Sequence, residues 1–101
     1  MEYPWMIQQL PDADIPFEGI TGKLFQGPDH QIVFFNIPAG VKLPAHSHGA
    51  QWGLVLEGEM EMIIGDKTHR FKKGDQYFIP EGVNHSAHFI TEIWVMDYFA
   101  E

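Results

Sequence analysis

Short runs of hydrophobic residues, each closed by glycine, proline, aspartate or asparagine, follow one another along the chain. Six of these runs are rich in β-branched and aromatic side chains, which favours strands over helices. They cover residues 31–37, 51–56, 60–64, 69–71, 76–79 and 90–99. Ten glycines and seven prolines leave little room for a long helix. The pattern therefore predicts an all-β sandwich or barrel.

One β-hairpin can be located within this series of runs. Residues 59–62 alternate polar and apolar side chains, as expected for a strand with one buried face. Gly65 and Asp66 then give a tight turn signal, and residues 67–71 supply the returning strand.

The first 20 residues follow no such pattern. Three prolines interrupt them, while Trp5 and Ile7 supply apolar anchors. We expect residues 1–20 to form an irregular arm of a single domain whose barrel spans residues 21–101. Such an arm caps the barrel or packs on a second subunit, and the sequence does not choose between these arrangements.

The charge balance narrows the possible partners. The chain of 101 residues carries 14 acidic and 6 basic residues, a formal net charge of -8. Phosphate contacts require lysine and arginine, so we expect neither nucleic acid nor an anionic membrane surface as a partner. No apolar run approaches the roughly 20 residues that span a bilayer, and the N-terminus lacks the basic start of a signal peptide. A cytoplasmic location is expected, and the absence of cysteine excludes disulfides and thiolate metal sites.

Three of the six histidines occupy positions that suit a metal site. One residue separates His46 from His48, so on a strand both side chains would project to the same face. His85 follows a later turn, and a small barrel can bring it beside this pair. On spacing alone, such a pair is as often structural as metal-binding. Likewise, Gln51 alone is more often an ordinary hydrogen-bonded residue.

The spacing of a larger set of residues resembles the two sequence motifs of the cupin superfamily. The first motif is matched by Gly40, His46, His48, Gln51 and Gly58, and the second by Gly74, Pro80, Gly82 and His85. The resemblance covers residues 40–89, half of the chain. It implies an antiparallel jelly-roll barrel that holds one divalent metal ion.

By position, the resemblance implies that His46, His48 and His85 bind this ion. Gln51 stands at or next to the position that usually holds a glutamate. Two departures from the family pattern are a shorter gap between His48 and Gln51, and Phe89 in place of an asparagine. Imidazole and carboxamide ligands suit zinc, nickel, iron, manganese or copper. Because all four ligands are neutral, the ion would keep its full charge and attract an anionic oxygen.

The last apolar run offers a candidate for proton transfer. Alternation over residues 93–99 places Asp97 and Phe99 on a face that is otherwise aliphatic. An aspartate on this face would be half-buried and would have a raised pKa, which suits acid–base chemistry. The alternative is that Asp97 lies in water or pairs with a cation, either Lys23 or Arg70.

The ligand set with glutamine, and the spacing of Asp97 and Phe99, are similar to cupins of pectin and alginate breakdown, which convert 4,5-unsaturated uronates to linear keto sugars. The resemblance implies that Asp97 is the proton donor or base and that Phe99 packs on the substrate. Tyr77 is a further candidate, at the mouth of the cavity. A substrate carboxylate would bind the metal, Arg70 or a lysine.

These residues predict a metal-dependent enzyme that isomerises or tautomerises a small carbonyl compound or an unsaturated uronic acid. An iron-dependent dioxygenase is a variant, because three histidines leave positions open for oxygen. The alternative is a non-catalytic module whose metal cavity captures a sugar or a signal molecule. The expected ligand is a small organic or sugar acid, and the resemblance to small cupins implies a homodimer.

Overall fold

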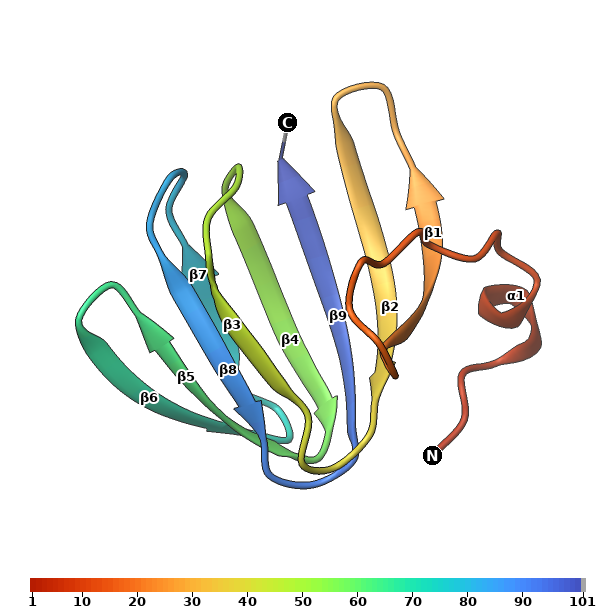
Figure 1. Ribbon diagram of the computed structural model, residues 1–101. Coiled ribbons are helices and arrows are strands. Elements are labelled where there is room, and N and C mark those ends of the chain that lie inside the picture. The colour runs from red at the N-terminus through yellow and green to blue at the C-terminus, as the bar shows by residue number, and fades with distance from the viewer. Residues whose placement is uncertain (101) are drawn as a thin grey trace.

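The computed structural model describes residues 1–100, which form one helical turn and nine strands. The elements are α1 (Trp5–Gln8), β1 (Thr21–Gln26), β2 (His30–Ile37), β3 (Lys42–His46), β4 (Gln51–Glu57), β5 (Glu59–Ile64), β6 (Lys67–Lys72), β7 (Gln76–Ile79), β8 (His85–Phe89) and β9 (Ile93–Ala100). All strand pairs are antiparallel. One sheet has the order β1-β2-β9-β4-β7 and the other β3-β8-β5-β6 (Figure 1). The predicted all-β jelly roll is confirmed.

The core lies between the two sheets. Val55, Ile79, Ile93 and Val95 of the five-stranded sheet, and Met60 of the four-stranded sheet, are each less than 2% exposed. Burial alternates residue by residue along β4, β8 and β9, as the period of a strand requires. The inward positions of these strands therefore define the interior in which a site can be built.

The hairpin predicted from the sequence is formed by β5 and β6. Met60 and Met62 are buried, while Glu59 and Glu61 remain partly exposed. The turn lies at Gly65 and Asp66. Gly65 has φ of 63°, in the left-handed region that glycine enters without strain.

Three strands, β1, β3 and β8, lie outside the six predicted runs. The sequences of β3 and β8 are rich in small and polar residues, KLPAH and HSAHF. These two segments are extended because they hydrogen-bond to neighbouring strands: β8 lies between β3 and β5 in the sheet. The run expected over residues 90–99 also begins later than predicted. Residues 90 and 91 form a bend, and β9 starts at Ile93.

The N-terminal arm, residues 1–20, packs along the edge of the five-stranded sheet beside β1 and β2 (Figure 1). The buried Tyr3 donates a hydrogen bond to the Phe35 carbonyl oxygen at 2.7 Å. Asp12 forms a β-bridge and an ion pair with Lys23, with 2.6 Å between Oδ1 and Nζ. Residues 13–17 then line the space between the sheets. Within residues 1–100, no helix has the length and apolar character needed to cross a membrane.

Candidate metal centre

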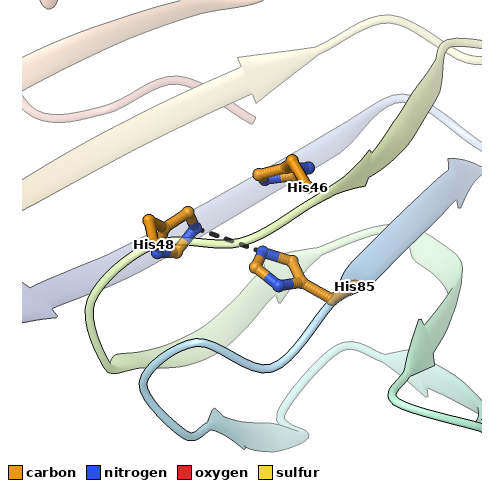
Figure 2. A group of neighbouring side chains, drawn as sticks. All are labelled: His46, His48 and His85. Atoms are coloured by element: carbon orange, nitrogen blue, oxygen red, sulfur yellow. Dashed lines mark hydrogen bonds between the residues drawn. The ribbon is translucent and has the colours of Figure 1, made fainter.

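The three histidines predicted as ligands lie together at one end of the jelly roll (Figure 2). His46 ends β3 and pairs in register with His85, the first residue of β8. His48 lies beyond β3, in the loop that leads to β4, so the expectation that a single strand carries both histidines is wrong. The backbone N–H of Gly82 donates to the His48 carbonyl oxygen at 2.9 Å. This bond ties the loop of His48 to the loop before His85.

The hydrogen bonds of the three rings fix which nitrogen is free. One ring nitrogen of each histidine lies within 4.8 Å of the others. Each Nδ1 atom lies close to a backbone carbonyl oxygen: 2.8 Å for His46 to Pro44, 2.7 Å for His48 to Gly49 and 3.0 Å for His85 to Val83. A carbonyl oxygen only accepts, so each Nδ1 carries a proton and donates it. Each neutral ring therefore keeps a lone pair on Nε2, the form that binds metal ions.

Two of these lone pairs face each other. The Nε2 atoms of His48 and His85 lie 3.1 Å apart (Figure 2). With both Nδ1 atoms protonated, this approach is unfavourable unless a proton or a metal cation lies between the rings. Burial lowers the pKa of His85. The hydrogen bond to the Val83 carbonyl raises this pKa, and the electrostatic effect of His46 and His48 lowers it further. The His85 ring is therefore neutral at neutral pH, which suits a metal ion better than a shared proton.

Gln51 supplies a further oxygen to the same cavity. It begins β4 and is 7% exposed, and its Oε1 atom has no hydrogen-bond partner among the described residues. A buried carbonyl oxygen that lacks a partner costs about 1–3 kcal/mol. An unpaired amide oxygen together with three imidazole lone pairs fits a divalent transition metal ion.

Asp97 faces the interior from β9 and is bonded to Tyr77 of β7. Between them, Gly53 of β4 pairs in register with Asp97 on one side and Tyr77 on the other. The Tyr77 hydroxyl donates to Asp97 Oδ1 across this glycine at 2.5 Å. A Cβ atom at position 53 would overlap both the Tyr77 ring and Asp97 Oδ1. The absence of a side chain at Gly53 therefore makes this hydrogen bond possible.

Burial is the main cause of the shifted pKa values of Asp97 and Tyr77. Burial raises the pKa of Asp97 from 3.8 to about 6, against hydrogen bonds from Tyr77 and Gln51 that lower it. Burial and the charge of Asp97 raise the pKa of Tyr77 well above 10, so Tyr77 remains the donor. The raised pKa expected for Asp97 is confirmed.

The alternative placement of Asp97, in water or paired with a cation, is wrong. Asp97 is 4% exposed. Lys23 forms its ion pair with Asp12, and Arg70 forms its ion pair with Glu59 at 2.8 Å.

A cavity of about 510 Å³ between the sheets is lined by all of these groups. Phe99 lines it too, with its ring centroid 5.4 Å from that of His48. Tyr77, expected at the cavity mouth, is instead buried in its wall. Arg70 is exposed on β6 outside the cavity, so the expectation that it binds the substrate is corrected.

Comparison with known proteins agrees with this geometry. A family model described as the cupin domain matches residues 33–95, more than half of the chain. The chain belongs to the cupin family. A search of curated proteins gives no match to this cupin.

Solved structures show the same fold. KdgF from Halomonas sp. is 25% identical to this cupin, with a TM-score of 0.80, and the match covers 92% of this chain and 87% of that one. An RmlC-like cupin from Shewanella frigidimarina is 24% identical, with a TM-score of 0.82 and coverage of 92% and 85%. Salicylate 1,2-dioxygenase from Pseudoaminobacter salicylatoxidans is 18% identical, with a TM-score of 0.77, and covers 87% of this cupin but 26% of its own chain.

Two residues that contribute to the site of this cupin, Gly53 and Phe17, are not predicted from the sequence. Gly53 was not singled out, although a glycine inside a strand pattern indicates a close approach of another group. Phe17 of the arm is the second contributor, and it lines the cavity. Its ring centroid lies 5.8 Å from that of His46. No local signal places the arm over the histidines, because that contact depends on packing between distant segments.

We expect Gly53→Ala to destabilise this cupin. The added methyl group would push Tyr77 and Asp97 apart, and overpacking of this kind costs about 1–3 kcal/mol. Urea unfolding monitored by tryptophan fluorescence measures the change. A midpoint equal to that of the wild type would show that the wall around Gly53 is looser than described.

Proposed function

We propose that this cupin is a metal-dependent isomerase or tautomerase of a small carbonyl compound or an unsaturated uronic acid. The observation that carries the proposal is a buried carboxyl group, Asp97, in one cavity with three imidazoles whose Nε2 atoms are free. His46, His48, His85 and Gln51 are the residues that would hold the ion. A divalent ion there would supply a Lewis acid that polarises a carbonyl oxygen.

Asp97 is the proposed proton carrier. Its carboxylate accepts the proton from the carbon next to the carbonyl group and returns it elsewhere on the substrate, which shifts a double bond without net oxidation. Tyr77, by its bond to Oδ1, keeps the carboxyl group in one orientation. Phe99 packs on the substrate beside His48.

KdgF, 25% identical to this cupin, shares its fold. The uronic acid as one substrate class is supported by the resemblance of Gln51, Asp97 and Phe99 to cupins of pectin and alginate breakdown. The likeness to salicylate dioxygenase is a likeness of fold, so the dioxygenase variant has no support of its own. The remaining alternative, a non-catalytic binding module, predicts a bound ligand that never exchanges a proton.

Proton exchange tests the proposal directly. The metal-loaded protein is incubated in D₂O with an unsaturated uronate, and separately with a weakly acidic ketone, and deuterium uptake is followed by NMR. We expect exchange on at least one substrate at a rate above that of the metal salt alone. Binding of both compounds without any exchange would support the binding module instead.

We also propose that the protein is cytoplasmic and forms a homodimer. Trp5 of the arm is 67% exposed, which supports the role of the arm as an anchor on a second subunit. Light scattering after size exclusion is expected to give the mass of two chains. A monomer at all protein concentrations would contradict the dimer.

A further inference from the structure

The cavity has one polar end and mainly apolar walls. Its polar end consists of His46, His48, Gln51, Tyr77, His85 and Asp97. The walls are aliphatic and aromatic, and include Ile37 and Leu43 of the sheets and Phe17 of the arm. Two further polar residues, Asp14 and Gln31, also line it. The Gln31 amide donates to Gln26 Oε1 at 2.8 Å, so one donor of that amide is already used.

Neither lysine nor arginine lines this cavity among the described residues. Three of the six cations form ion pairs with Asp12, Glu57 and Glu59 away from it. Two carboxyl groups, those of Asp14 and Asp97, line the cavity instead. A carboxylate on the ligand would therefore find no cationic side chain, and only a bound metal ion would offset its repulsion by these two groups.

Sugar hydroxyl groups would find few hydrogen-bond donors in this cavity. The Nδ1 protons of the three histidines are held by backbone carbonyls, and the Tyr77 hydroxyl is held by Asp97. The Gln51 amide is held as well, by its hydrogen bond to Asp97. A hydroxyl group buried against the apolar walls loses its water without gaining a hydrogen bond. Burial of an apolar part of a ligand against the same walls is favourable.

From this distribution we propose that the site takes an uncharged, enolisable carbonyl compound with an apolar body rather than a sugar acid. The inference rests on the proposed function and names its substrate class. The carbonyl oxygens lie at the polar end, and the body lies against the walls near Leu43 and Phe17. The C–H proton passes to the Asp97 carboxylate, and the C–H electron pair becomes the C=C bond. The carbonyl oxygen then takes the proton back from Asp97, which completes the keto–enol change.

Calorimetry on the zinc-loaded full chain tests the proposal with two probes. One is 1-phenylpropane-1,2-dione, which is uncharged and apolar, and the other is a 4,5-unsaturated uronate monosaccharide. We expect the dione to bind at least tenfold more tightly than the uronate. A uronate that binds as tightly as the dione, or more tightly, would overturn the proposal.

A charge-reversal variant provides a matched control. Asp14 is exposed on the arm at the cavity lining, so Asp14→Lys adds a cation there without disturbing the core. We expect the uronate affinity to rise at least threefold and the dione affinity to stay within twofold. A uronate affinity that does not change in this variant would overturn the argument from charge.

The outcomes separate this proposal from the proposed function. A dione that binds tightly but exchanges no proton in D₂O upholds the ligand class and contradicts the tautomerase. Exchange on the uronate, with weak binding of the dione, upholds the tautomerase and overturns the ligand class.

Discussion

Replacing Asp97 with asparagine is expected to lower turnover by about 10²–10⁴-fold, the usual contribution of a positioned proton carrier. The amide has nearly the same shape as the carboxyl group, but it does not accept a proton from carbon. Its oxygen still accepts the hydrogen bond from Tyr77, so the wall of the cavity should remain intact. Steady-state rates, together with the metal content of each preparation, measure the effect.

The matched control for this variant is Asp66→Asn. Asp66 is exposed in the turn between β5 and β6 and does not line the cavity. We expect its rate and metal content to equal those of the wild type. A rate for Asp97→Asn within a factor of about three of the wild type would remove Asp97 from the mechanism.

Loss of one histidine ligand is the second large effect expected. His85→Ala removes the ring nitrogen that lies 3.1 Å from His48 Nε2. Loss of an outer hydrogen-bond partner alone costs roughly 10–100-fold in metal affinity, so we expect loss of a ligand to cost more than about 100-fold. Dialysis against a metal buffer followed by elemental analysis gives the affinity.

His88→Ala is the control, because His88 lies on the same strand, β8, but does not line the cavity. It should keep the metal affinity of the wild type. Equal metal content in the His85 and His88 variants would contradict the assignment of the ligands.

The sequence was sufficient to predict the features that depend on the pattern of residues within one strand or one motif. Alternation along residues 93–99 placed Asp97 on the inner face, because side chains on a strand alternate whatever the neighbouring strands do. The resemblance to the cupin motifs implied that His46, His48 and His85 lie together, and the structure places them so.

The rest depends on register between distant strands, which no local pattern contains. The Tyr77–Asp97 bond exists because β7 and β9 flank Gly53 on opposite sides of β4. The outward position of Arg70 is set instead within the β5–β6 hairpin, where Arg70 pairs opposite the partly exposed Glu61. A shift of one residue in either register would send these side chains to the other face.

The central claim is that three imidazoles bind one metal ion, and X-ray absorption at the metal edge of the loaded protein tests it most directly. Scattering from the outer atoms of imidazole rings counts the histidines bound to the metal. We predict three, with the remaining nearest neighbours being oxygen. A spectrum that requires one histidine or none would contradict this account of the site.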